Sequence, residues 1–378
     1  MQDLKTLSKE TCNRLIIKIG SALLVDPDSG QIKQDWLNSL AQDINELRQK
    51  GIDILIVSSG SIALGKKDLG LFGRPNKLEE AQASAAIGQV LLAQSYADAF
   101  APFGITVAQM LLTLDDLEDR PRHLNARGTV EALLSRRIIP VINENDTVAT
   151  SEIRFGDNDR LAARVGSLAK ADLVVLLSDI DGLYTANPKL DSQAHFIECV
   201  PEITEEIEKM AGPAVSTNSS VGTGGMTTKI MAAKMATKAG CSLAIARGTE
   251  PHPLSQMIAT GRATLFPASQ TPLALRKQWL STMQTPRGFV HIDTGAANAL
   301  TKGASLLPVG VVRADGQFNR GDLVGIMGET GHLIGQGLAN FDSVDAQKII
   351  GSSSEAISKI LGASVRSTLI HRDDLVLF

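Results

Sequence analysis

The sequence predicts a large α/β domain followed by a small β-rich domain. Its 378 residues are too many for one ordinary domain, so two are expected. In the first two thirds, short apolar runs of strand length alternate with segments of helix composition, which is typical of an α/β domain. Beyond the prolines at positions 267, 272 and 286, the pattern changes to short strands separated by turns.

The composition is that of a folded protein, with 43% hydrophobic residues and a formal net charge of −4. This mild acidity gives no general attraction for nucleic acid, which would require a local basic patch. The three cysteines (Cys12, Cys199 and Cys241) are far apart and lack metal-ligand spacing, which favours reduced thiols. The first residues contain no apolar core of signal-peptide length, and no apolar run approaches a membrane span. We therefore expect a cytoplasmic protein without membrane segments.

Hydrophobic periodicity predicts the elements of the first domain. Apolar runs predict strands at 15–21, 53–57, 105–112, 138–142, 173–177 and 242–246. Helix composition predicts helices at 34–50, 78–100, 123–136 and 161–171, and another that ends at residue 238. Gly51 closes the first of these helices, and Asp157 is expected to cap the fourth. The densely charged stretch 115–122 is expected to be a solvated loop over the sheet.

The first strand carries a lysine, Lys18, inside an apolar run that ends in Gly20-Ser21. Burying a lysine in a central strand is costly unless a negative charge meets it. An edge strand, which leaves the amine in water, is the alternative. The lysine therefore indicates either an edge strand or a buried ionic site.

A long polar stretch, residues 142–159, lies between the fourth strand and the helix after it. Its amides and carboxylates are Asn143, Glu144, Asn145, Asp146, Asp157, Asn158 and Asp159. Ligands of open α/β sheets bind beyond the carboxyl ends of the strands, which is where this stretch is expected. Such residues are also ordinary in loops, but turn chemistry alone needs fewer of them. The stretch therefore predicts a ligand site.

Two glycine-containing segments have the character of anion sites. Residues 58–61, SSGS, join a buried strand to a helix, so backbone N–H groups and the helix dipole favour an anion there. Residues 221–229, VGTGGMTTK, have the chemistry of a phosphate cradle, with Lys229 in the first helical turn. Their spacing is not that of a Walker A loop. The alternatives are close helix packing for the first segment and a flexible linker for the second.

Five segments, in this order, resemble the glutamate 5-kinases of the amino acid kinase family: IIKIGSALL, VSSGSIALG, VINENDTVATSEIRFGDNDRLAA, SDIDGLYTANP and GTGGMTTK. In the tail, GASLLPVGVV and FNRGDLV resemble a PUA domain. The resemblance covers essentially the whole chain. It implies a three-layer α/β/α sandwich with a mainly parallel sheet at 1–265, a linker at 266–286, and a small β-barrel-like PUA domain at 287–378. The implied reaction is ATP-dependent phosphorylation of the L-glutamate γ-carboxylate to L-glutamyl 5-phosphate, the first step of proline biosynthesis.

The resemblance also implies roles for residues that match the family motifs. The implied catalytic residues are Lys18, Lys229 and Asp159, with Asp159 orienting both lysines through ion pairs. The implied glutamate-binding residues are Ser59, Gly60, Asn143, Asp146 and Asn158. The implied ATP-binding residues are Lys18, Gly20, Ser178, Asp179, Thr223, Gly224, Gly225, Met226, Thr227, Thr228 and Lys229. Mg²⁺ is expected to enter with ATP, held largely by phosphate oxygens and water, and no protein ligand is predicted for it.

Alternative functions remain open from the sequence alone. Acetylglutamate kinase, aspartokinase and uridylate kinase share the glycine segments and lysines, although the NEND…GDND stretch and the PUA-like tail argue against them. A second class is an RNA-binding protein that acts through the PUA domain, but acidic residues offset the arginines of the tail and no aromatic platform is evident. The resemblance implies proline as a feedback inhibitor and a dimer or tetramer, with residues 115–127 and 147–155 as candidates for coupling the inhibition.

The C-terminal elements follow from alternation and turn signals. Strands are expected at 288–292, 307–312, 322–327, 333–338 and 374–378, with one helix at about 344–361.

Overall fold

The computed structural model describes residues 4–71, 73, 75, 77–148, 158–188, 190–211, 225–271, 274, 277, 280, 285–362 and 367–378. The chain forms two compact units, Met1–Pro272 and Leu273–Phe378. Each unit is described by itself.

The N-terminal unit is built on a seven-stranded sheet with the order β3-β4-β2-β1-β5-β8-β9. Its strands are β1 (Arg14–Ile19), β2 (Asp53–Ser58), β3 (Val107–Leu112), β4 (Ile139–Glu144), β5 (Leu173–Ser178), β8 (Ser242–Arg247) and β9 (Ala263–Phe266). All neighbours pair in parallel except β8 and β9, which are antiparallel. The predicted, mainly parallel sheet is therefore confirmed.

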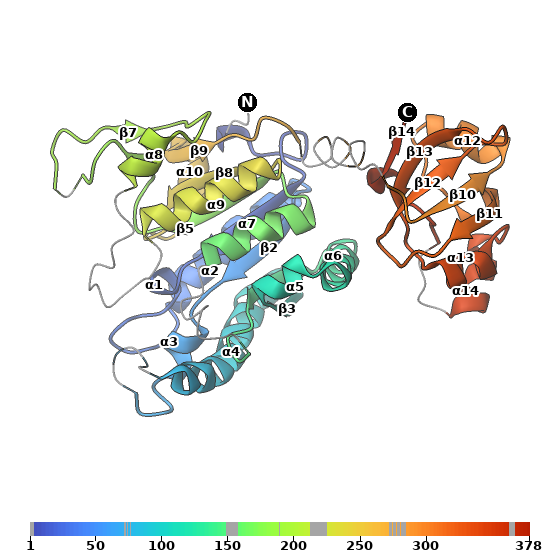
Figure 1. Ribbon diagram of the computed structural model, residues 1–378. Coiled ribbons are helices and arrows are strands. Elements are labelled where there is room, and N and C mark those ends of the chain that lie inside the picture. Colours follow the sequence, from blue (N-terminus) through green and yellow to red (C-terminus); the bar gives the residue numbers. More distant parts are fainter. Residues whose placement is uncertain are drawn as a thin grey trace. The chain divides into compact units, whose positions relative to one another are not determined.

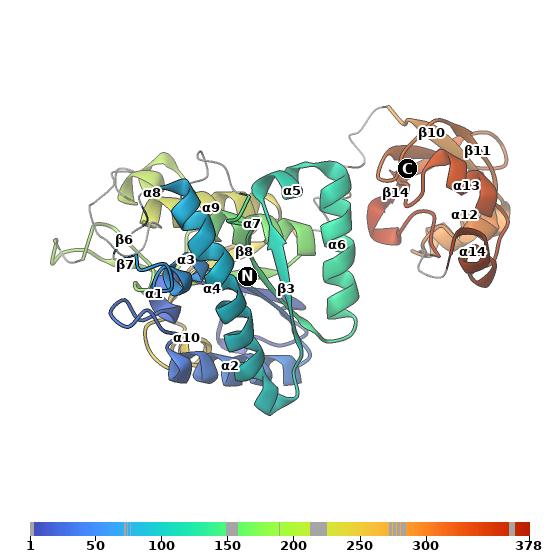
Figure 2. The ribbon, with the colours of Figure 1, turned by 90° about the horizontal axis from the view of Figure 1, so that it is seen from below.

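Helices cover both faces of this sheet, which makes the expected three-layer sandwich (Figure 1). One face carries α2 (Gln34–Gln49), α4 (Leu78–Phe100) and α10 (Pro253–Thr260) (Figure 2). The other carries α6 (Arg120–Leu134), α7 (Asn158–Ala169) and α9 (Met226–Lys238). Shorter elements are η1 (Leu4–Thr6), α1 (Ser21–Leu24), α3 (Ser61–Gly65), η2 (Ala101–Phe103), α5 (Leu114–Glu118) and α8 (Glu205–Met210).

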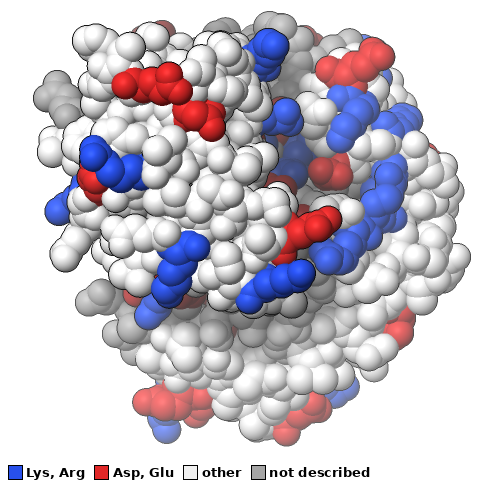
Figure 3. Space-filling view, turned by 90° about the vertical axis from the view of Figure 1, so that its right-hand side faces the viewer, with Lys and Arg blue, Asp and Glu red and all other residues white. Residues whose placement is uncertain are grey.

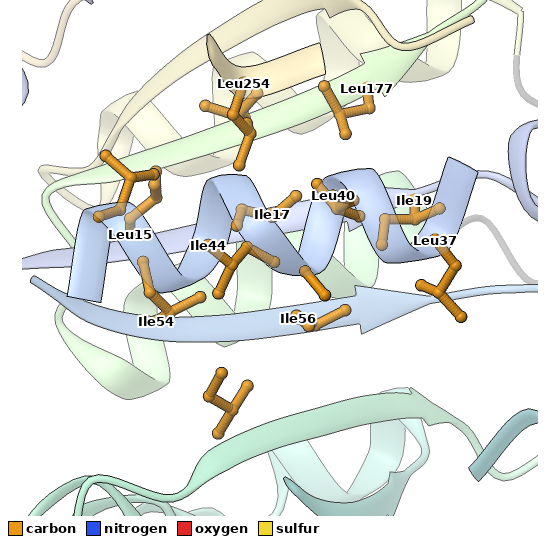
Figure 4. Packing of buried hydrophobic residues seen from close by; sticks show 14 of the residues in the cluster. Leu15, Ile17, Ile19, Leu37, Leu40, Ile44, Ile54, Ile56, Leu177 and Leu254 are labelled. Atoms are coloured by element: carbon orange, nitrogen blue, oxygen red, sulfur yellow. The ribbon is translucent and has the colours of Figure 1, made fainter. Parts of the chain in front are cut away.

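Alternate residues of each central strand enter opposite cores. Ile17 of β1 and Ile56 of β2 pack against Leu40 of α2, as Figure 4 shows, whereas Ile16 and Val57 lie in the core beneath α7 and α9. Strands buried on both faces need near-continuous apolar sequence, which explains why these strands read as mainly apolar runs, interrupted in β1 by Lys18.

Strand β1 is central, because it pairs with β2 on one side and β5 on the other. The edge-strand alternative for Lys18 is therefore wrong. Lys18 is nevertheless only 7% exposed, so its amine requires a buried counter-charge.

Helices α3 and α4 pack with their backbones in close approach. A Cβ at Gly88 of α4 would overlap the carbonyl oxygen of Ser61, and a Cβ at Gly65 of α3 would overlap that of Ser84. Glycine is the only residue that fits either position without a shift of backbone. This contact fixes α3 at the carboxyl end of β2.

The charged stretch 115–122 is not the predicted loop. It contains α5 and the start of α6. Thr113 and Asp116 form a capping box for α5, and the Asp119 side chain caps α6. The T-x-x-D spacing is a local helix-start signal that the charge density obscured.

Several further elements of the N-terminal unit were not predicted, among them the helices α8 and α10, the strand β9 and the paired strands β6 (Leu183–Tyr184) and β7 (Phe196–Ile197). Strand β9 lies directly before Pro267, and β6 pairs with β7 in an antiparallel hairpin. Asp181 accepts hydrogen bonds from the Tyr184 hydroxyl at 3.1 Å and from Arg262 Nε at 2.9 Å. The Arg262 guanidinium also lies 3.6 Å from the centre of the Phe196 ring. These contacts attach the hairpin to the residue before β9.

The C-terminal unit contains a five-stranded sheet with the order β11-β10-β12-β13-β14. Its strands are β10 (Gly288–Ile292), β11 (Val311–Gly316), β12 (Leu323–Met327), β13 (Leu333–Leu338) and β14 (Leu375–Leu377). Its helices are α12 (Thr294–Thr301), η4 (Pro308–Gly310), α13 (Ser343–Ile349), α14 (Ser354–Leu361) and η5 (Arg372–Asp374). The strand expected at 307–312 begins only at Val311, and the single helix expected at 344–361 is two helices, broken at Gly351 (φ 71°).

All three cysteines are free thiols. Burial raises the pKa of Cys12 to about 12. Among the described residues, no helix has both the length and the apolar character that crossing a membrane requires.

Candidate active site

The predicted site residues gather at the carboxyl edge of the N-terminal sheet. Strands β1, β2, β4 and β5 end there, and α7 and α9, which run back along the sheet, begin there. Of the polar stretch 142–159, Asn143 and Glu144 belong to β4, and Asn158 and Asp159 to α7, so these four are not loop residues. The expected cap Asp157 lies outside the described residues.

Three buried charges form the centre of the site. The Asp159 carboxylate, which is fully buried, lies 2.6 Å from Lys18 Nζ and 2.9 Å from Lys229 Nζ. Lys18 comes from β1, Asp159 from the first turn of α7 and Lys229 from the first turn of α9. The predicted pairing of one carboxylate with both lysines is thus present.

The charge balance of this triad favours an anion. Burial alone would raise the pKa of Asp159, but the charges of Lys18 and Lys229 outweigh it and hold that pKa below its ordinary value. One carboxylate neutralises one of two buried ammonium groups, so the triad keeps a net positive charge. An anionic group that approaches both lysines would neutralise this remaining positive charge.

The start of α9 adds backbone donors beside Lys229. The helix begins at Met226 after the extended cap Gly225, and open space lies around the position that a Gly225 Cβ would take. Thr228 approaches the Asp159 carboxylate at 3.3 Å, and Thr227 lies in the same first turn. The N–H groups and the dipole at a helix start attract phosphate. The predicted residues Thr223 and Gly224 lie outside the described residues.

Ser178 and Asp179 lie at the end of β5, next to β1. Ser178 is buried and donates to Asp179 Oδ1 at 3.1 Å, while Asp179 is exposed. Gly20 follows β1, and a Cβ there would lie 3.8 Å from Lys18 Nζ. These three residues therefore border the triad on the β5 side.

A network of buried amides occupies the β2–β4 side of the same edge. Asn158 Nδ2 lies 2.6 Å from the Ser58 carbonyl oxygen, 2.6 Å from Ser59 Oγ and 3.0 Å from Asn143 Oδ1. Asn158 is 5% exposed, and its Oδ1 has no hydrogen-bond partner among the described residues. A buried acceptor without a partner is costly, so this oxygen marks a place for a ligand donor.

Asp146 extends this network toward solvent. It accepts a hydrogen bond from Ser61 Oγ at 3.0 Å, and Ser61 Oγ lies 3.4 Å from Asn143 Nδ2. Burial raises the pKa of Asp146, and the Ser61 hydrogen bond only partly opposes this shift. Gly60, between Ser59 and α3, has a φ of 119°, which other residues rarely adopt.

Two residues of this network were not predicted as site residues. Gln89 Oε1 accepts from Asn143 Nδ2 at 2.8 Å, and the hydroxyl of Tyr96 lies 2.9 Å from Ser58 Oγ. Both come from the middle of α4, where nothing in the local sequence separates an inward glutamine from an outward one. Their position depends on the packing of α4 against α3.

Comparisons with known proteins show the family to which this chain belongs. A model of the amino acid kinase family matches residues 13–247, and a PUA domain model matches residues 288–361. A curated relative from Dinoroseobacter shibae, named glutamate 5-kinase, is 52% identical over 98% of this chain and 100% of its own length. The glutamate 5-kinase of Nitrobacter hamburgensis is 53% identical over 96% of this chain and 95% of its own. The chain therefore belongs to the amino acid kinase family and carries a C-terminal PUA domain.

Proposed function

We propose that this chain is a glutamate 5-kinase, which transfers the γ-phosphoryl group of ATP to the γ-carboxylate of L-glutamate. A carboxylate oxygen bonds to the phosphorus as the bond to ADP breaks, giving L-glutamyl 5-phosphate and ADP. The nucleophile is already ionised at neutral pH, so no general base is needed. The Lys18–Asp159–Lys229 triad is the observation that carries this assignment, because phosphoryl transfer depends on positioning and neutralisation of charge.

In this proposal the triad holds the transferring phosphoryl group. Lys18 and Lys229 stabilise the charge on its oxygens, and Asp159 keeps both ammonium groups converged. The amides at the start of α9 (Gly225, Met226, Thr227, Thr228), together with Gly20, Ser178 and Asp179, receive the nucleotide, as do Thr223 and Gly224.

The amide network holds glutamate. The substrate's α-ammonium donates to Asn158 Oδ1, the buried acceptor without a protein partner, and pairs with the Asp146 carboxylate. Ser59, the Gly60 amide and Asn143 orient the remaining polar groups. Asn158 and Asp159 are consecutive in α7, so the substrate end and the phosphoryl end of the site share one helical turn.

Mg²⁺ accompanies the nucleotide in this proposal. The described residues contain no group of three or more His, Cys, Asp or Glu that could hold a metal ion. The Asp159 carboxylate is engaged by the two lysines, which leaves Asp179 as the exposed carboxylate beside the triad. In this proposal the cation is bound mainly through phosphate oxygens and water.

Regulation and assembly also belong to the proposal. We expect proline to inhibit at or near the glutamate side. We expect a homodimer or tetramer that forms through the N-terminal unit, and the exposed Val90 and Leu91 of α4 support this expectation. An RNA-binding role receives less support, because acidic side chains lie beside many of the basic ones on the face shown in Figure 3, and Arg313 is paired with Asp315 at 2.7 Å.

The test is ATP turnover with L-glutamate, N-acetylglutamate, L-aspartate and UMP, each with hydroxylamine to trap an acyl phosphate. Glutamate-dependent ADP release together with γ-glutamyl hydroxamate is the expected result. Turnover only with another acceptor would overturn the assignment of Asp146 and Asn158. The absence of turnover with all four would overturn the proposed function.

A further inference from the structure

Helix α4 supplies an interior support for the amide network. Its residue Gln89 is 9% exposed, and its Oε1 accepts from Asn143 Nδ2 at 2.8 Å. Asn143 in turn contacts Asn158, so three side-chain amides from α4, β4 and α7 form one chain. The chain ends at Asn158 Oδ1, the oxygen without a protein partner.

Backbone groups, which can act only as a donor or only as an acceptor, determine how each side-chain amide in this series is oriented. Asn143 Oδ1 accepts from the Glu144 backbone N–H at 2.9 Å, so the opposite amide atom, Nδ2, must face Gln89. The Ser58 carbonyl can only accept, so the Asn158 atom that faces it is Nδ2. Each amide therefore has one possible orientation, and Asn158 presents its oxygen to the site.

We propose that Gln89 is a positioning residue that holds Asn143, and through it Asn158, in the orientation that selects a substrate with an α-ammonium group. This inference rests on the proposed glutamate kinase function and deepens it. Gln89 itself does not touch the substrate. It supplies the acceptor for the second N–H of a side chain that is 2% exposed.

Removal of this acceptor has a local consequence. Among the described residues, Asn143 Nδ2 would then keep only Ser61 Oγ, at 3.4 Å, as a partner. A buried donor without a good partner is costly, so Asn143 would move toward Ser61. That shift would pull on Ser61, whose hydroxyl accepts from Asn143 and donates to Asp146, and would draw Asn143 Oδ1 away from Asn158. Both groups proposed to receive the α-ammonium are then displaced, while the lysine triad is untouched.

The test compares Gln89→Met, which keeps the length of the side chain and removes its polar end, with Gln89→Glu, which keeps an acceptor. Gln94→Met is the matched control, because Gln94 lies on the same helix and pairs with Asp98 on the surface. The measurements are kcat and KM for L-glutamate, KM for ATP, and the ratio of kcat/KM for L-glutamate to that for glutarate, which lacks the α-amino group.

We expect Gln89→Met to raise KM for glutamate about tenfold, within the range that an unpaired buried donor gives. Its kcat and its KM for ATP should stay within about twofold of the parent, and its preference for glutamate over glutarate should narrow by a similar tenfold factor. Gln94→Met should change none of these, and Gln89→Glu should raise KM less than about threefold.

Three outcomes would overturn the inference: an unchanged KM in Gln89→Met, an equal loss with glutamate and glutarate, or equal rises in KM for glutamate and ATP. If Gln89→Met does not fold, Gln89→Glu carries the test, and a rise of about tenfold or more in that variant would refute the role. Failure of the proposed function itself would be seen earlier, as the absence of glutamate turnover by the unmodified protein.

Discussion

The two sides of the candidate site are built from different chemistry. The side between β1 and α9 is ionic, with one fully buried carboxylate between two lysines. The side between β2 and β4 is mainly neutral, with amides and hydroxyls that are supported from α4. Its carboxylate, Asp146, has a hydroxyl partner and a raised pKa, whereas the pKa of Asp159 is lowered.

The ionic side is therefore expected to determine the catalytic rate, and the amide side the selectivity for the substrate. Fixed charges in a buried site stabilise a charged transition state strongly but discriminate poorly among anions. Oriented amides contribute less to rate but reject a ligand that leaves them unpaired. Changes on the ionic side should therefore lower kcat, and changes on the amide side should raise KM for glutamate.

The largest effect is expected from Lys229→Ala and Lys18→Ala. Each removes one of the two preorganised cations and the net positive charge of the triad, so kcat should fall by about 10² to 10³. Steady-state kinetics measures this. Lys234→Ala is the control, because Lys234 lies on the same helix and pairs with Glu208 at the surface. Near-normal turnover in either lysine variant would contradict a catalytic role for the triad.

Asp146→Ala tests the opposite side. It removes the carboxylate proposed for the substrate ammonium, so KM for glutamate should rise by about 10- to 100-fold, as for a lost charge-assisted hydrogen bond. The decrease in kcat should be smaller than this. If KM for ATP changed instead, the two sides of the site would have been assigned in reverse.

Gly88→Ala tests whether the amide side depends on α4. The added methyl group would overlap the Ser61 carbonyl and push α3 from α4, which should lower the free energy of unfolding by about 1–3 kcal/mol. KM for glutamate should rise, and KM for ATP should not. Chemical denaturation and kinetics together measure both effects, and a variant as stable as its parent would show that α3 adapts freely.

The smallest effect is expected from pH. The pKa of Asp146 is raised and that of Asp159 is lowered, so acidification neutralises Asp146 first. As the pH falls, kcat/KM for glutamate should decline by a few-fold before any loss that arises from the triad. Asp146→Asn should remove this decline. If kcat/KM for glutamate still declined at low pH in Asp146→Asn, the titrating group would be a residue other than Asp146.

The same pKa shifts predict the acid stability of the two sides. The folded-state pKa of Asp159 is below its unfolded value, so its contribution to stability is present above about pH 4 and is lost as the pH falls through the folded value. The pKa shift of Asp146 has the opposite sign, so its carboxylate makes no such contribution to the stability at neutral pH.

The ionic side could be predicted from the sequence because its signals are local. A lysine in an apolar strand and a lysine after a glycine run are each unusual, and a family motif connects them to Asp159. Gln89 could not be predicted, because Gln89 and Gln94 lie in the same alanine-rich helix and only the close approach of Gly88 to Ser61 turns one of them inward. Helix α4 itself was predicted with its correct bounds, whereas β9 was missed because it has only four residues and Pro267 follows it directly.

The central position of β1 has a consequence for how the protein is made. The triad joins residues 18, 159 and 229, and Lys18 lies between two parallel partner strands, β2 and β5, that both follow it in the chain. Such long-range pairings form late, because the intervening loops must close first. During synthesis, Lys18 emerges from the ribosome long before α9 and must wait without its final partners. Enzymatic activity therefore requires that α9, the last helix of the ionic side, has packed against the sheet. A time course of activity during translation would show when the N-terminal unit completes its folding.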